Sequence, residues 1–216
     1  MTRPSCPPAD AGLVAASRAL AVAAGLSFEP EAHAYALDGE RVLSVTQVLR
    51  AVGLDPWEHV PPAVREPARR RGAAVHAAIH YLVEEDLDRD ALDPRLAPYV
   101  LAYDRFRRDT GFVPDLVERH VVSRTYRFAG RLDQAGPWPP GGRAVIDVKS
   151  GLVAPATRLQ LAGYALCLEG PHRRFALHLG ADGRYRLSPE FTEANDRRLF
   201  LAALAVAQFK LGQRPR

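Results

Sequence analysis

The distribution of apolar and polar residues along the chain predicts an α/β protein. Three consecutive segments are rich in apolar and β-branched residues, which is typical of strands; they span residues 116–123, 125–133 and 143–149. Other segments have the spacing of amphipathic helices; they span residues 68–85, 94–109, 155–168 and 189–209. Because helices precede and follow the strands, we expect a central mixed sheet flanked by helices.

Two Asp-Gly pairs predict tight turns, because Asp-Gly between alternating segments is a strong hairpin signal. An N-terminal β-hairpin is expected from residues 28–37 and 41–45 around Asp38-Gly39, and a second hairpin from residues 173–179 and 184–187 around Asp182-Gly183.

Prolines and apolar spacing define the expected helix boundaries and buried faces. Four prolines between residues 56 and 67 predict an irregular segment, since proline breaks helix hydrogen bonding. A short helical turn is expected over residues 46–52. We expect the inward helix positions to be Val75, Ile79 and Leu82 in one helix and Leu199, Ala203 and Val206 in the last one.

Length and composition predict one well-buried domain. The chain has 216 residues. We expect residues 1–26, which are Pro-rich and then Ala-rich, to be flexible or weakly helical. Residues 27–216 are then expected to form the single folded domain.

Charge and cysteine content narrow the class of protein. The net charge of +4 and the pI of about 9.3 favour an anionic partner. Cys6 and Cys167 are too few for a disulfide framework or an iron–sulfur cluster, and Cys167 is expected to be a buried apolar residue. These features predict an intracellular, cytoplasmic protein. No apolar stretch is long enough to predict membrane association.

Lys149 is the first candidate for chemistry, because it is one of only two lysines in the chain. It stands two residues after Asp147, so both side chains project from the same face of a strand. Asp133 is expected at the end of the neighbouring strand, about 5 Å away. A lone aspartate there is more often structural, but two close carboxylates with a lysine favour a Mg²⁺ or Mn²⁺ site.

A helical histidine and a polar helix edge add weaker candidates. His76 follows a run of three arginines and Gly72, and His80 competes with it on the same helix face. The arginines fit either a solvated helix face or phosphate contacts. Gln160 and Tyr164 share one helix face, and an amphipathic helix edge explains them as well as a binding role does.

Together these residues resemble the PD-(D/E)XK nuclease superfamily, in particular its RecB-like branch and the phage-type exonucleases. The resemblance covers about residues 76–164, and the elements follow the family's order. The first motif of the superfamily is Pro-Asp, and here Leu132 replaces the proline before Asp133. In the second motif, (Asp/Glu)-X-Lys, the acidic position is Asp147 and the lysine is Lys149. The matching elements are Gly72…His76, Glu118, Gly130-Arg131-Leu132-Asp133, Ile146-Asp147-Val148-Lys149 and Gln160…Tyr164.

The resemblance implies a restriction-endonuclease-like core and a divalent-metal-dependent DNA exonuclease that serves DNA processing, repair or recombination. A protein partner in a recombination or repair assembly is a further expectation. The implied metal ligands are His76, Asp133, Asp147 and the backbone carbonyl of Val148, with Glu118 as a weaker candidate. The implied catalytic residues are Lys149, Asp133, Asp147, Gln160 and Tyr164. The candidate contacts to single- or double-stranded DNA are Arg69, Arg70, Arg71, Arg131 and Arg158.

Two alternatives remain open from the sequence. A catalytically silent nucleic-acid-binding module would keep the fold and bind DNA without cleaving it. An unrelated α/β hydrolase would cleave a small phosphoester but not DNA, although the chain has neither a P-loop nor a nucleophile elbow.

Overall fold

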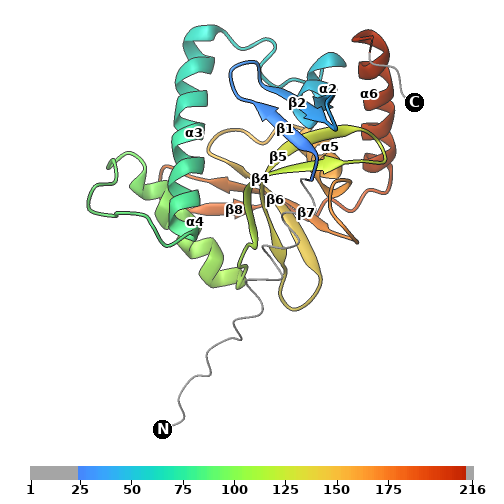
Figure 1. Cartoon of the computed structure of the whole chain (residues 1–216). Coiled ribbons are helices and arrows are strands. Elements are labelled where there is room, and N and C mark those ends of the chain that lie inside the picture. Colours follow the sequence, from blue (N-terminus) through green and yellow to red (C-terminus); the bar gives the residue numbers. More distant parts are fainter. Residues whose placement is uncertain (1–23, 213–216) are drawn as a thin grey trace.

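The computed structural model describes residues 24–212. Most of the expected flexible N-terminal segment, and Cys6, therefore lie outside the described residues. The described elements, in chain order, are β1 (Leu26–Glu29), β2 (Ala34–Leu37), β3 (Glu40–Ser44), α2 (Val45–Ala51), α3 (Pro62–Val83), α4 (Ala97–Thr110), β4 (Leu116–Ser123), β5 (Phe128–Pro137), β6 (Arg143–Lys149), α5 (Thr157–Ala165), β7 (Arg173–Leu179), β8 (Tyr185–Leu187) and α6 (Asn195–Lys210) (Figure 1).

The strands form one mixed sheet of eight strands, which confirms the predicted α/β class. Its order is β1-β2-β3-β5-β6-β7-β8, with β4 paired to β5. The β3–β5 and β6–β7 pairs are parallel, and the remaining pairs are antiparallel. The parallel β6–β7 pair is joined through α5, as expected for a crossover connection.

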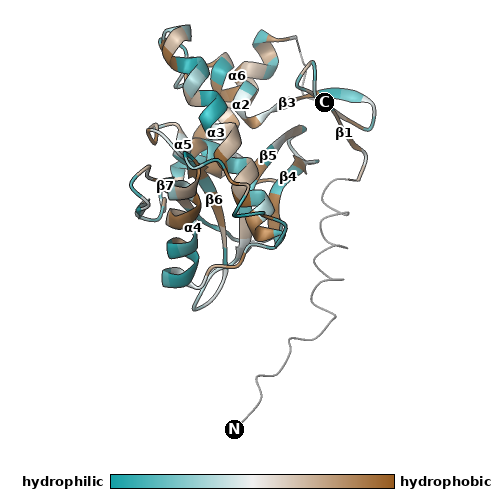
Figure 2. Ribbon diagram, turned by 90° about the vertical axis from the view of Figure 1, so that its left-hand side faces the viewer, coloured by the Kyte–Doolittle hydropathy of each residue, from teal (hydrophilic) through white to brown (hydrophobic). Residues whose placement is uncertain are grey.

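Helices cover both faces of the sheet. Neighbouring residues of a strand point to opposite faces, and in β6 both sets are apolar and pack against helices. Val145 packs with residues of α2, α5 and α6. The adjacent Ala144 and Ile146 pack with residues of α3 and α4. In Figure 2 the central strand β6 is brown, whereas α3 and α4 carry teal, hydrophilic segments. The core is thus split into two layers by the sheet.

Several predicted elements are confirmed. The predicted bounds of β4, β6 and β7 agree with the structure. Val75 and Ile79 are buried and Leu82 packs against the same cluster. Helix α2 begins with a capping box between Ser44 and Gln47, which satisfies backbone donors at its first turn. Cys167 is buried as expected.

The N-terminal hairpin differs from the prediction. Residues 28–37 do not form one strand, because a turn separates β1 from β2. Pro30 lies in this turn, and His33 has a φ of 46°, which no regular strand residue adopts. The Asp38-Gly39 turn that joins β2 to β3 is confirmed.

The expected start of α3 at residue 68 was wrong. The helix begins at Pro62, where a proline is tolerated because the first helical N–H groups have no partner. It continues through Pro67, which the prediction treated as a breaker. Proline at the sixth helical residue costs one hydrogen bond, but it does not end the helix here.

The bounds of β5 also differ. The strand begins at Phe128 instead of residue 125, because residues 124–127 make the turn and Arg127 has a φ of 52°. It extends to Pro137 through pairing with β6. Asp133 therefore lies within β5 and does not close it.

The last two helices are shorter than predicted. The expected inward face of α6 was wrong for Leu199 and Val206, whereas Ala203 packs against the core as expected. Helix α5 covers Thr157–Ala165 and α6 begins at Asn195. Leu199 and Val206 are exposed at 51% and 47%. The buried apolar residues of α6 are Phe200, Leu204 and Ala207. Within the described residues, no helix combines the length and apolar character needed to cross a bilayer.

Close packing between α5 and α6 gives a first testable prediction. A Cβ on Gly163 would lie 2.7 Å from two ring carbons of Phe200. Gly163→Ala is expected to lower the free energy of unfolding by about 1–3 kcal/mol, since overpacking forces the ring to move. Urea denaturation measures this. Gly141→Ala is the control, because nothing lies within 4 Å of the added atom; equal stability of the two variants would contradict the prediction.

Candidate functional site

The site lies where the sheet opens beside β5. One edge of β5 pairs with β4 over residues 128–135. The other edge is shared by two strands, with β3 at residues 128–129 and β6 at residues 134–137. Among the described residues, 130–133 have no strand partner on that second edge. Side chains can therefore converge there without competing with a backbone ladder.

Three carboxylates occupy corresponding positions on neighbouring strands. The flanking β4–β5 pairs, Val117 with Gln134 and Arg119 with Leu132, place Glu118 across from Asp133, although Glu118 itself has a φ of 48°. The β5–β6 ladder ends one residue before Asp133 and Asp147, so these two lie next to each other where the strands separate. The sequence prediction that Asp133 and Asp147 lie on adjacent strands agrees with this register.

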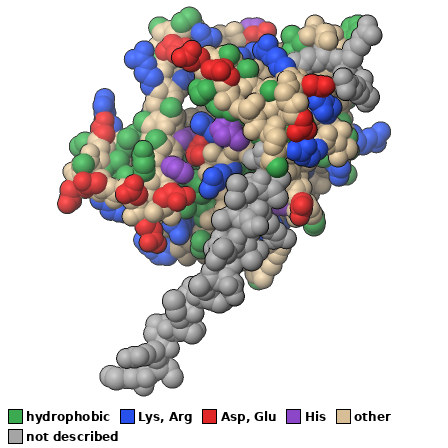
Figure 3. Space-filling view, in the orientation of Figure 1, with side chains coloured by type: hydrophobic (Ala, Val, Ile, Leu, Met, Phe, Trp, Pro, Cys, Tyr) green, Lys and Arg blue, Asp and Glu red, His purple; other side chains and the backbone are tan. Residues whose placement is uncertain are grey.

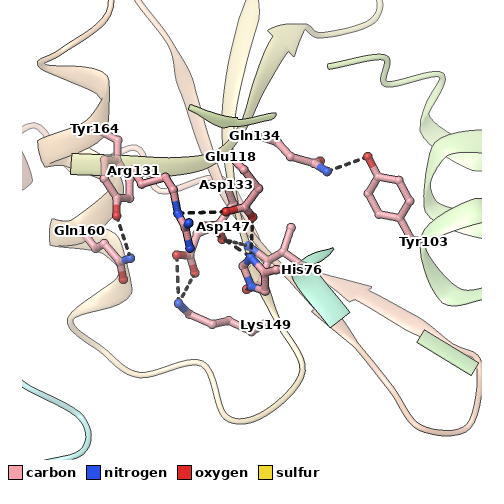
Figure 4. Close-up of polar contacts among 11 residues, drawn as sticks. His76, Tyr103, Glu118, Arg131, Asp133, Gln134, Asp147, Lys149, Gln160 and Tyr164 are labelled. Carbon is pink, nitrogen blue, oxygen red and sulfur yellow. Dashed lines mark hydrogen bonds and ion pairs between the residues drawn. The ribbon is translucent and has the colours of Figure 1, made fainter. Parts of the chain in front are cut away.

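His76 reaches this row of acids from α3 (Figure 4). Its Nδ1 lies 2.7 Å from Oε1 of Glu118 and 3.8 Å from Oδ1 of Asp133. Its Nε2 lies 3.0 Å from the carbonyl oxygen of Val148. The residue predicted as a ligand from a weak local signal is thus in contact with three of the other site residues.

The contacts of His76 are those of an imidazolium. A carboxylate and a carbonyl oxygen both accept hydrogen bonds, so both ring nitrogens donate. Burial lowers the pKa of His76, but the charge of Asp133, with the hydrogen bond and charge of Glu118, raises it more, and the resulting pKa is about 9. The protonated ring supplies a positive charge among the acids.

Asp133 is held by the backbone of β6. Its Oδ2 accepts a hydrogen bond of 2.7 Å from the N–H of Val148. Burial and the nearby charge of Asp147 raise the pKa of Asp133, whereas His76 and Lys149 lower it, and the net shift is upward. A raised pKa means that the negative charge of this carboxylate is unfavourable here, and a bound cation would stabilise that charge.

Lys149 and Asp147 form a close pair. The Nζ of Lys149 lies 2.9 Å and 2.8 Å from the two carboxylate oxygens of Asp147. The side chain of Asp147 is only 1% exposed. Burial lowers the pKa of Lys149, but Asp147 and Asp133 raise it more, so the ammonium stays charged. Asp147 therefore faces Lys149, and its predicted role as a metal ligand stays a prediction.

Gln160 and Tyr164 lie on α5 beside the same opening. The amide nitrogen of Gln160 donates to the Tyr164 hydroxyl at 3.4 Å. Tyr164 packs over Gly130, where a Cβ would lie 2.8 Å from its ring. Burial raises the pKa of Tyr164 well above its usual value, and Asp133 adds to the effect. Glycine at position 130 thus leaves room for the ring beside the site.

An open cleft with a volume of about 1120 Å³ is lined by His76, Glu118, Asp133, Gln160 and Tyr164, whereas Asp147, Val148 and Lys149 are not among its lining residues. It lies between α3, the β2–β3 region, strands β4 and β5, and α5. Arg131 lines it and lies 3.2 Å from Glu118. The cleft therefore gives solvent access to Glu118 and Asp133.

The predicted DNA-contacting arginines divide into two groups. Arg69, Arg70 and Arg71 are exposed on α3, near the cleft residue Gly72. Arg158 lies outside the residues that line the cleft, and its Nε donates to the fully buried Asp196 at 2.6 Å. The structure therefore gives Arg158 a role in joining α5 to α6.

Sequence reasoning missed several residues that line the cleft: His33, Tyr35, Tyr81, Glu84 and Asp86. Glu84 could have been found from helical spacing, because His76, His80 and Glu84 recur every four residues on one face. His33 gave no local signal, since it reaches the cleft from the β1–β2 turn.

The donor set can hold a divalent cation. Ligand atoms of His76, Glu118 and Asp133 all lie within 4.8 Å of one another. Carboxylate and carbonyl oxygens suit Mg²⁺ or Mn²⁺, whereas imidazole also suits ions such as Zn²⁺, so this donor set does not select one metal. Glu118, the weaker sequence candidate, is therefore a better-placed donor than Asp147. The imidazolium and a metal ion would compete for the same acceptors.

Fold and site together define an α/β protein with a histidine–carboxylate cluster at an opening in a mixed sheet. No family model matches the chain, and no curated protein matches its sequence.

Proposed function

We propose that this protein is a divalent-metal-dependent DNA nuclease with a PD-(D/E)XK, restriction-endonuclease-like core, and that it is an exonuclease of the RecB-like, phage-type branch. The observation that carries the proposal is the position of Lys149. It is bound to Asp147 and lies beside Asp133 where β5 and β6 separate.

The residues that would hold the ion are His76, Glu118, Asp133 and the carbonyl of Val148. A divalent ion bound there would lower the pKa of a water and stabilise negative charge on the scissile phosphate. His76 must release its proton and its contacts before its ring nitrogen can act as a ligand.

Lys149 would act on the attacking water and the phosphate. Its ammonium has three hydrogens. The contacts to Asp147 orient the group and leave a hydrogen for a water or a phosphate oxygen. A fixed positive charge there stabilises the charge that develops in the transition state. Asp147 would be a positioning residue in this arrangement.

Neighbouring groups would hold the DNA backbone. Arg131 is 57% exposed at the cleft and can exchange Glu118 for a phosphate. The arginines of α3 would add affinity without reading sequence. Gln160 and the Tyr164 hydroxyl would position the strand beside Lys149.

The direct test is incubation of the purified protein with end-labelled single- and double-stranded DNA. Cleavage with Mg²⁺ or Mn²⁺, but not with EDTA, is the expected result. A protein that cleaves a small phosphoester but not DNA would contradict the proposal and favour an unrelated hydrolase.

Metal binding can be measured without activity. Mn²⁺ at about 100 times its Kd is expected to stabilise the fold by about 2.7 kcal/mol, which raises Tm by several degrees. His76→Ala should abolish most of this increase. His80→Ala is the matched control, because His80 lies one turn later on the same face. An equal Tm increase in both variants would exclude His76 as a ligand.

One observation favours the catalytically silent module as a second candidate. The His76 imidazolium already satisfies the acceptors Glu118 and Val148. A site that is complete without metal could serve binding alone. Salt-sensitive DNA binding without cleavage, and without a metal-dependent rise in Tm, would identify this function.

A further inference from the structure

The cleft extends in two directions from His76. Helix α3 lines it with Gly72, His76 and His80, and Glu84 lines it just after the helix ends, at the same four-residue spacing. At 1.5 Å per residue, Arg69 lies roughly 10 Å from His76 along the helix, and Glu84 lies roughly 12 Å away in the other direction. The two ends of the cleft can therefore differ in charge.

The end of the cleft near the β1–β2 turn is basic. The start of α3 carries Arg65, Arg69, Arg70 and Arg71 against one acid, Glu66. The pKa of His33, in the β1–β2 turn, is lowered by burial and then by Arg131, Arg50 and Arg69. These arginines come from β5, α2 and α3. Arg131 lines the cleft, and Arg50 and Arg69 lie close enough to His33 to lower its pKa.

The opposite end is acidic. Glu84 and Asp86 line the cleft just after α3 and are exposed. Within residues 24–212, neither carboxylate has an ion-pair partner. Their charges are therefore not neutralised by the protein.

The space-filling view shows histidines, drawn in purple, near the middle of this face, with acidic and basic side chains around them (Figure 3). A phosphate backbone is attracted by arginines and repelled by unpaired carboxylates. A polymer that crossed the whole cleft would have to place phosphates beside Glu84 and Asp86. A polymer that ends there avoids this repulsion.

We propose that one DNA strand enters the cleft over the basic end and that its terminus lies at the acidic end, so that the protein acts on strand ends and releases short products. This inference rests on the proposed nuclease function and adds how the substrate lies in the cleft.

The distance from His76 to the acidic end limits the product. A stacked DNA strand rises about 3.4 Å per nucleotide. Roughly 12 Å of helix length therefore accommodates at most about three nucleotides beyond the site. Tyr81 is 49% exposed and lines this part of the cleft. Its ring offers a stacking surface for a base of the terminal segment.

The test compares linear with circular single-stranded DNA of the same sequence. The wild-type protein is expected to cleave the linear strand at least about tenfold faster and to release products of at most about three nucleotides. In the double variant Glu84→Lys/Asp86→Lys the preference should fall below about threefold, and longer products should appear. Equal cleavage of both substrates by the wild type, or an unchanged preference in the variant, would overturn the inference.

A matched control separates local charge from net charge. Asp90→Lys/Glu169→Lys makes the same change in net charge at exposed positions outside the cleft lining. It should keep the wild-type preference for linear DNA. A loss of preference in this control would show that net charge alone explains the effect.

Binding in EDTA distinguishes this inference from the nuclease proposal. Without metal, the wild type should still bind linear single-stranded DNA more tightly than circular DNA, and Glu84→Lys/Asp86→Lys should remove the difference. If no DNA is cleaved but this difference is present, the nuclease proposal fails and the orientation of the strand stands. Equal binding of both forms by the wild type would overturn the orientation itself.

Discussion

Lys149→Ala is expected to reduce the rate of metal-dependent DNA cleavage by about 10²–10³-fold or more, because it removes a fixed positive charge beside the scissile phosphate. Initial rates on end-labelled DNA measure the effect. Lys210→Ala is the natural control, since Lys210 is the only other lysine. Its ammonium donates to the carbonyl of Ala51 at the end of α2. Its loss should leave the cleavage rate within about twofold, as expected for a surface substitution.

Two further variants keep this prediction testable if the alanine variant is unstable. Removing Lys149 leaves Asp147 buried without its partner, which is costly. Lys149→Gln retains a hydrogen-bond donor but no charge, and Lys149→Arg retains charge without a compact ammonium. Both should be folded, as judged by cooperative thermal unfolding, and both should be strongly impaired. Cleavage at the wild-type rate by a folded Lys149→Gln protein would exclude the proposed role.

Asp196→Ala is expected to lower the free energy of unfolding by about 3–5 kcal/mol, because it removes one partner of a buried ion pair. Asp196 is fully buried at the first turn of α6. One oxygen lies 2.6 Å from Arg158 Nε, and the other lies 2.9 Å from Arg174 Nη1. Arg174 is only 11% exposed, so it would lose its countercharge in a poorly hydrated position.

Urea denaturation followed by circular dichroism measures this loss. Glu193→Ala is the comparison, because Glu193 is 51% exposed and lies 3.6 Å from Arg158. Exposed pairs contribute about 0–1 kcal/mol, so this variant should remain close to the wild type. Similar stabilities of the Asp196 and Glu193 variants would show that the buried network contributes little.

The strands were predictable from the sequence wherever the local signal was strong. β6 and β7 are apolar runs bounded by polar or turn residues, and their bounds were predicted correctly. The start of α3 was harder to predict. The destabilisation expected from a proline in a helix is an average value, and it does not include the tertiary packing that can offset it. The burial of Val75 and Ile79 stabilises α3, which also contains Pro67.

The parts of the site that are close in sequence could be predicted, whereas the long-range contacts could not. The spacing of Asp147 and Lys149 on one strand determines their contact. Glu118 meets His76 across 42 residues, and this contact depends on the β4–β5 register and on the position of α3. No local pattern encodes the register or the helix position, so a solvent-facing role for Glu118 was as well supported by the sequence as a role in the site.

The inward face of α6 could not be predicted for a related reason. Both Leu199–Val206 and Phe200–Leu204–Ala207 satisfy helical spacing. The choice between them depends on where α5 and Phe128 lie, and the ring of Phe200 packs against Phe128 with centroids 5.1 Å apart. Amphipathic spacing identifies a helix but does not choose between two apolar faces.

The opening beside residues 130–133 creates a local conflict between folding and chemistry. The β5–β6 ladder stops at Gln134 and Ile146, and beyond that point Asp133 binds the Val148 N–H with its side chain. An apolar residue at position 133 would favour continued pairing of the two strands, which would gain sheet hydrogen bonds and lose the acid. This is a site of local frustration, where the most stable sequence is not the functional one. Selection for stability alone would therefore tend to close this opening.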